Sequence, residues 1–181
     1  MVRKYVVTKG TTDTLLLQKL LPANVKSDVA FIEGKGKSSA ESMSRSLLAV
    51  KQRPLALVLD ANSSNEAAIE EYRHVVREFL GQASAGTEYE VFLAVPEIEG
   101  LFFYDRTVLH SLIGLDPGDI SFAVGQYVPR KTLCELLNRE SSNFEDLVSS
   151  LDDNAICVLQ SHPLIQDLSE FLTKTASEAA A

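Results

Sequence analysis

The segment at residues 55–60 constrains the fold most, because five uninterrupted apolar residues there end abruptly on Asp60. A parallel strand that helices cover on both faces needs such a continuous apolar run, whereas a strand with one solvated face alternates. Open α/β sheets place their ligand sites at the carboxyl ends of such strands. Asp60 and Asn62 are therefore predicted to be oxygen ligands at a sheet edge, and the first hypothesis is a divalent metal bound there together with a phosphate-containing substrate.

The amino-terminal half repeats a strand followed by a helix. Four segments are predicted strands: residues 5–8, 29–32, 55–59 and 89–95. Strands linked through helices pair in parallel with right-handed crossovers. We therefore expect an α/β fold with a mainly parallel sheet of about four strands and helices on both faces. In the helix after the second strand, the apolar stripe of Met43, Leu47 and Val50 is predicted to face the sheet.

The carboxyl-terminal part changes character, because short helical patterns there are separated by Pro, Gly, Asn and Asp. These patterns cover residues 106–113, 130–138, 144–151 and 164–172. A chain of 181 residues with 45% hydrophobic composition predicts one domain with a sizeable core. We expect an α/β core at residues 1–105, a helical extension at 106–175 packed on the same domain, and a disordered tail at 176–181.

Composition and charge exclude several classes of protein. No segment has the roughly 18 to 20 apolar residues of a membrane span, and the amino terminus lacks a signal-peptide core, so we expect a cytoplasmic protein without a membrane partner. The net charge of −8 argues against a generally basic nucleic-acid binder but leaves room for a local basic rim. Cys134 and Cys157 lack metal-binding spacing and are predicted to be buried free thiols.

Acidic and amide side chains follow the predicted strands in succession. They are Asp13 in the first turn of the first helix, then Glu33, Asp60, Asn62, Glu97 and Glu99 at strand ends. Because parallel strands end at one edge, we expect these groups to gather there and to provide ligands for Mg²⁺ or Mn²⁺. Two ordinary explanations stay open, since acids favour helix starts and Asn or Asp favours turns after strands.

The order of these features is similar to that of a known family. A strand-turn-helix at residues 6–13, a Gly-rich loop at 34–39 and the segment 57–62 resemble the TOPRIM domain of topoisomerases, primases and OLD-family nucleases. The segment Val-Pro-Glu-Ile-Glu at 95–99 resembles an element of OLD-like and small stand-alone TOPRIM proteins, many of them associated with bacterial antiphage defence. The resemblance covers about the first 105 residues, and residues 162–172 resemble part of the small members.

The resemblance implies a metal-dependent nuclease acting on DNA or RNA. Asp60, Glu99 and Lys9 would then be catalytic, and the metal ligands would come from Asp60, Asn62, Glu97, Glu99 and Glu33. Lys9, Lys37 and Gly10 would contact the phosphate.

The chain departs from the family at two positions. Lys9 stands where active members have Glu, and Asn62 ends the usual Asp-x-Asp. An ammonium group in place of a carboxylate repels a cation, so these departures argue for reduced or lost activity. Two further hypotheses therefore stay open: a catalytically degenerate module that binds nucleic acid, a nucleotide or a protein, and a subunit of a larger complex.

Overall fold

The computed structural model describes residues 4–138 and 144–178, with side chains as far as Lys174. Four strands form one all-parallel sheet in the order β2-β1-β3-β4. Their bounds are β1 Lys4–Thr8, β2 Val29–Glu33, β3 Leu55–Asp60 and β4 Tyr89–Ala94. The predicted α/β fold with a parallel sheet is therefore confirmed, and each strand lies within one residue of its predicted bounds.

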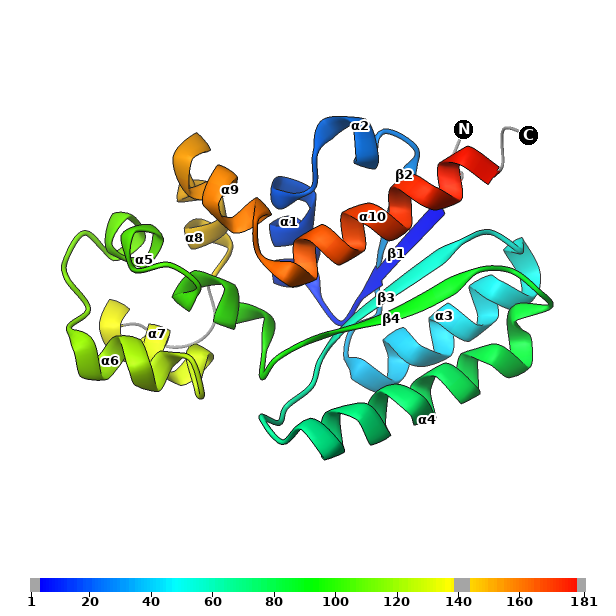
Figure 1. Cartoon of the computed structure of the whole chain (residues 1–181), viewed down its shortest axis with the longest axis horizontal. Coiled ribbons are helices and arrows are strands. Elements are labelled where there is room, and N and C mark those ends of the chain that lie inside the picture. The colour runs from blue at the N-terminus through cyan, green and yellow to red at the C-terminus, as the bar shows by residue number, and fades with distance from the viewer. Residues whose placement is uncertain (1–3, 139–143, 179–181) are drawn as a thin grey trace.

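Helices cover both faces of the sheet (Figure 1). The elements of the amino-terminal part are α1 Thr11–Leu20, α2 Ala23–Lys26, α3 Lys37–Lys51 and α4 Glu66–Ser84. Those after the sheet are the 3₁₀ helix η1 Ile98–Phe103 and the helices α5 Arg106–Ile113, α6 Asp119–Gly125, α7 Pro129–Leu137, α8 Glu145–Ser150, α9 Asp153–Gln160 and α10 Pro163–Glu178. Helices α3 and α4 lie on one face, and α1 and α10 lie on the other (Figure 1).

The buried side chains form two clusters that follow the alternation of the strands. The smaller cluster contains Val7, Leu57 and Leu59 from the strands together with buried residues of α3 and α4. Val6 and Val58 belong to the larger cluster, which also contains buried residues of α1 and of every helix from α7 to α10. The carboxyl-terminal helices therefore share one hydrophobic core with the sheet.

A buried lysine connects β1 with α10. Lys4, at the start of β1, is only 2% exposed. Its Nζ donates to the carbonyl oxygen of Leu172 in α10 and lies 3.5 Å from Asp28 Oδ1. The ammonium group is thus compensated inside the core, as a buried charge requires.

The predicted inward face of α3 is right only in part, because Leu47 packs against the smaller cluster but Val50 does not. Ala40, Ser44 and Leu48 are buried there, whereas Val50 of the predicted stripe is 74% exposed. Small side chains let the helix approach the sheet closely. The buried Ser44 hydroxyl group donates a hydrogen bond to the Ala40 carbonyl oxygen at 2.8 Å, so it is not left without a partner. The spacing of the larger apolar residues alone therefore pointed to a neighbouring face of the helix.

The structure differs from the sequence predictions in its helices and cysteines. It contains α6 and α9, which the sequence patterns did not indicate. Both cysteines are free, but Cys157 is exposed and Cys134 is only partly buried, so their predicted burial is wrong. Helix α10 extends to Glu178, and the remainder of the predicted tail, residues 179–181, lies outside the described residues.

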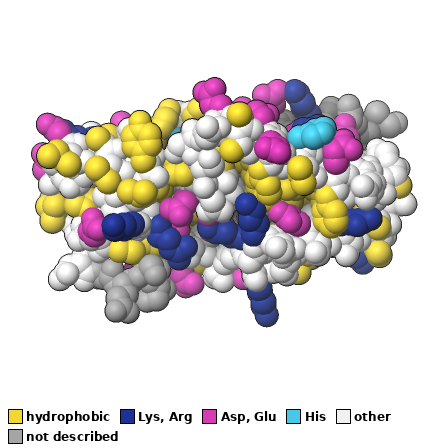
Figure 2. Space-filling view, turned by 90° about the horizontal axis from the view of Figure 1, so that it is seen from below, with side chains coloured by type: hydrophobic (Ala, Val, Ile, Leu, Met, Phe, Trp, Pro, Cys, Tyr) yellow, Lys and Arg dark blue, Asp and Glu magenta, His cyan; other side chains and the backbone are white. Residues whose placement is uncertain are grey.

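Two further observations concern the helices and the surface. Within residues 4–138 and 144–178, none of the helices is long and apolar enough to cross a membrane. On the lower side of the molecule, Lys and Arg side chains gather near the middle, with Asp and Glu among them (Figure 2).

Candidate functional site

The chain changes direction across the sheet between β1 and β3. It runs from β1 outward to β2, then crosses back so that β3 lies on the other side of β1. Open α/β folds bind ligands at such a reversal, beyond the carboxyl ends of the two strands. Lys9 directly follows β1, and Asp60 is the last residue of β3, so both lie at this point.

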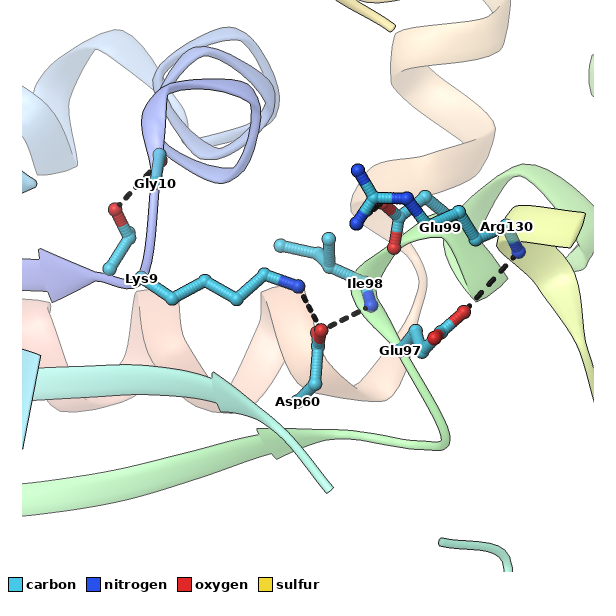
Figure 3. Close-up of polar contacts among 8 residues, drawn as sticks. Lys9, Gly10, Asp60, Glu97, Ile98, Glu99 and Arg130 are labelled. Carbon is cyan, nitrogen blue, oxygen red and sulfur yellow. Dashed lines mark hydrogen bonds and ion pairs between the residues drawn. The ribbon is translucent and has the colours of Figure 1, made fainter. Parts of the chain in front are cut away.

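Lys9 and Asp60 form an ion pair at the centre of the site (Figure 3). Lys9 Nζ donates to Asp60 Oδ2, and the backbone N–H of Ile98 donates to Asp60 Oδ1 at 2.9 Å. The side chain of Asp60 is 6% exposed and that of Lys9 is 22% exposed. Both carboxylate oxygens of Asp60 therefore have donors from the protein itself.

Two further buried acids surround the ion pair. Asp13 comes from the first turn of α1 and Glu99 from η1, and they are 4% and 2% exposed. The pKa of Asp13 is raised to about 7, mainly by burial; Lys9 opposes this shift, and Asp60 and Glu99 add to it. Burial lowers the pKa of Lys9, but Asp13, Asp60 and Glu99 outweigh it and raise this pKa above its ordinary value. Lys9 is therefore a charged ammonium group.

Glu99 and Arg130 connect the site to the carboxyl-terminal helices. Arg130 Nη1, from α7, lies 3.7 Å from Glu99 Oε1. Burial raises the pKa of Glu99, and Lys9 and Arg130 oppose this shift. The other oxygen, Oε2, is buried without a hydrogen-bond partner in the described part of the chain. Sequence reasoning missed Arg130, because no motif links it to strand ends more than thirty residues earlier.

Glu97 and Asn62 lie at the rim of the site, and their described hydrogen bonds are to backbone groups of other residues. Glu97 Oε2 accepts from the backbone N–H of Arg130 at 3.3 Å, so this carboxylate caps the first turn of α7. Asn62 has a φ of 53°, in the left-handed region that Asn tolerates, and its N–H donates to the Pro96 carbonyl at 2.8 Å. Its side chain is exposed.

Three predicted site residues have their contacts elsewhere. Glu33 Oε2 accepts from Thr11 Oγ1 at 3.0 Å, although β2 does lie beside β1. Lys37 Nζ lies 3.6 Å from the centre of the Tyr72 ring on α4. Gly10 is the N-cap of α1, and its carbonyl accepts from Thr8 Oγ1 at 3.1 Å and from Thr14 N–H at 3.1 Å. None of these contacts includes the Lys9–Asp60 pair.

The described arrangement does not fit a divalent metal bound at Asp60. In the part of the chain with described side chains, no three His, Cys, Asp or Glu side chains gather closely enough to hold a metal ion. The Lys9 ammonium group occupies the position that a metal cation would take beside Asp60 Oδ2. The site thus carries its own positive charge.

Comparisons with known proteins identify no relative. No protein-family model, curated protein or solved structure matches this chain. What the structure shows is an α/β fold with a four-stranded parallel sheet.

Proposed function

We propose that this chain is a TOPRIM-like module that binds nucleic acid without hydrolysing it. The observation that carries the proposal is the Lys9–Asp60 ion pair at the reversal point of the sheet. In the family that the sequence resembles, active members have Glu at the position of Lys9 and use it for metal binding or acid-base work. Replacing that carboxylate by an ammonium changes the local charge by about two units, which disfavours a metal cation there.

The energetics of the ion pair support a resident lysine. A metal bound to Asp60 would have to displace Lys9, which is only 22% exposed and close to the buried Asp13 and Glu99. Moving one partner away from a largely buried charge pair leaves the other without compensation. The ammonium group therefore competes with any metal ion for the same carboxylate.

Two features support a phosphate-containing ligand at this edge. Open α/β sheets bind ligands beyond the strand ends where the strand order reverses, which is where Lys9 and Asp60 lie. Arg130 is 44% exposed beside them, and its guanidinium group suits phosphate through bidentate hydrogen bonds. Nucleic acid is the phosphate ligand of the family that the sequence resembles.

One observation favours a second candidate, the metal-dependent nuclease that the sequence resemblance implies. Glu99 Oε2 is buried without a hydrogen-bond partner among the described residues. An unpartnered buried carboxylate oxygen is an unsatisfied acceptor that a cation would satisfy. This candidate requires Lys9 to leave Asp60, so it makes a different prediction about metal binding.

Calorimetric titration with Mn²⁺ and Mg²⁺ separates the two candidates. For the non-hydrolysing module we expect no binding heat in the wild type or in Asp60→Ala, no cleavage of labelled DNA or RNA, and measurable binding of one of these nucleic acids. Binding heat in the wild type that Asp60→Ala abolishes, together with metal-dependent cleavage, would establish the nuclease instead. A chain that binds neither DNA nor RNA overturns the proposal.

Lys9→Glu provides the complementary test. This variant restores the carboxylate of the family pattern, and we expect it to bind Mn²⁺ more tightly than the wild type because the site gains negative charge. Lys51→Glu is the matched control, since it makes the same charge change at an exposed position at the end of α3. Equal Mn²⁺ affinity in both variants would show that Lys9 does not set the charge of the site.

A further inference from the structure

A groove of about 840 Å³ lies next to the Asp60 site. One wall is the loop after β3, with Asn62, Ser63 and Ser64; the other comes from the start of α7 and the residues before it, with Tyr127, Arg130 and Lys131. We call this the α7 groove. It continues from the ion pair, because Arg130 belongs to the groove lining and also lies 3.7 Å from Glu99.

Two cations on the α7 wall are available to an anionic ligand. The side chain of Arg130 is 44% exposed and that of Lys131 is 77% exposed. Lys131 Nζ lies 3.9 Å from Glu135 Oε1, and exposed pairs of this kind contribute little, so a phosphate group can replace Glu135 at small cost. Glu97 is the acid that the described lining includes, and it accepts from the Arg130 N–H.

An aromatic ring stands beside these cations. Tyr127 is 68% exposed, which is unusual for a large aromatic side chain, and it follows α6 by two residues. An exposed ring next to basic side chains is the arrangement on which unpaired bases stack, while the cations hold the phosphates between them. A base inside a duplex cannot stack on a protein ring in this way.

The loop wall provides neutral polar groups. Asn62 is exposed, with its backbone fixed by the bond to the Pro96 carbonyl. Ser63 Oγ accepts from the Asn65 N–H at 3.1 Å, so its own hydroxyl hydrogen is available for donation. Neutral donors of this kind contact the phosphates and sugars of nucleic acids without adding negative charge.

We infer that the α7 groove binds single-stranded nucleic acid, with a base stacked on Tyr127 and adjacent phosphates at Arg130 and Lys131. This inference rests on the proposed function and adds the form of the ligand and the residues that recognise it. It accounts for binding by an acidic protein, because the contact is confined to one short basic segment beside an exposed ring.

The test measures binding of a labelled 12-nucleotide oligo-dT, an oligo-U of the same length and a 12-base-pair duplex by fluorescence anisotropy. Tyr127→Ala should weaken single-strand binding by about 5- to 100-fold, as loss of one base stack does, while Tyr127→Phe keeps the ring and the affinity. Lys131→Ala should weaken binding several-fold and reduce the slope of log affinity against log salt by about one. Comparison of oligo-dT with oligo-U identifies the preferred sugar.

Lys174→Ala is the matched control for Lys131→Ala, because both lysines are exposed and pair with a Glu four residues away in a helix. It should leave single-strand binding unchanged. Single-strand binding that Tyr127→Ala and Lys131→Ala do not weaken, or a preference for the duplex, overturns this inference and leaves the proposed function standing. Absence of binding to all three probes overturns both.

Discussion

At the scale of single residues, Asp60 joins two segments that are distant in the sequence. Its carboxylate accepts from Lys9, which follows β1, and from the backbone of Ile98, which begins η1. The three groups lie in a region where water reaches little of the Asp60 side chain, which is 6% exposed. Losing one partner therefore leaves the others poorly solvated.

The first prediction concerns this pair. Asp60→Ala should lower the free energy of unfolding by about 2 to 4 kcal/mol, because it removes the acceptor of both Lys9 and the Ile98 N–H. The double variant with Lys9→Met should recover part of this loss, since no unpaired ammonium group is left. Urea denaturation of the wild type, the two single variants and the double variant measures the coupling. Strict additivity of the two single losses would contradict it.

The second prediction concerns Asp13, whose pKa burial raises from 3.8 to about 7. The folded state then holds the proton more tightly than the unfolded state. The free energy of unfolding should therefore fall as the pH rises from about 4 to about 7, by at most about 4 kcal/mol from this group. Asp13→Asn removes this contribution, so its stability relative to the wild type should increase across that interval and level off above it.

Thermal denaturation of both proteins in steps of pH checks this expectation. The difference between the midpoints is the quantity to follow, because other titrating groups are common to the two proteins. A difference that stays constant from about pH 4 to about pH 8 would mean that Asp13 ionises normally in the folded chain.

The sequence predicted part of the site for a clear reason. Lys9, Asp60 and Glu99 follow strand ends, and the ends of parallel strands meet at one edge, so their proximity followed from the order of elements. Arg130 was not predictable in this way, because its approach depends on how α7 packs beside η1. Glu33 was predicted at the right edge, but a local hydroxyl partner on α1 engages it.

At the scale of elements, α3 lies close to the sheet because Gly34 and Ala40 are small. A Cβ atom on Gly34 would stand 2.4 Å from Ala40 Cα, which is far inside contact distance. We expect Gly34→Ala to cost about 1 to 3 kcal/mol of unfolding free energy through overpacking. Gly10→Ala, where nothing lies within 4 Å of the added Cβ atom, should cost about 1 kcal/mol or less as an N-cap change.

A urea midpoint for each of the two glycine variants is sufficient to compare them. Equal and small losses would show that α3 moves away from β2 without cost. The larger loss at Gly34 would instead explain why a glycine is needed directly after β2, at a place where its φ is not positive.

The elements differ in how far the sequence predicts them. The buried strand β3 was predictable because helices on both faces require an unbroken apolar run. Helix α6 was not, since Ile120 and Val124 are 81% and 44% exposed and give it no polar outer face. On α3, two of the three buried residues, Ala40 and Ser44, are small, and a pattern of large apolar side chains does not mark them.

At the scale of the whole molecule, the sheet and the carboxyl-terminal helices share one apolar cluster. Val6 from β1 and Phe92 from β4 belong to it together with Leu133 from α7 and Leu168 from α10. The Phe92 ring meets the Phe171 ring at a centroid distance of 5.9 Å. On this face of the sheet, the core is therefore built from both parts of the chain.

We therefore expect one cooperative unfolding transition for the full chain. Far-ultraviolet and tyrosine near-ultraviolet circular dichroism should give the same urea midpoint. A fragment of residues 1–105 should bind a hydrophobic dye strongly, because Val6, Phe92 and the buried face of α1 would be uncovered. Two separated transitions, or a fragment with a sharp transition of its own, would show that the parts fold independently.

The central position of β1 has a consequence for synthesis of the chain. Of the four described strands, β1 is made before the others but lies between β2 and β3, and its Lys4 donates to a carbonyl in α10. A ribosome must therefore release the chain as far as Leu172 before that lysine finds its acceptor. Until then the sheet face that carries Val6 lacks the cover of α10, and apolar surface that is exposed during synthesis is the kind that chaperones bind.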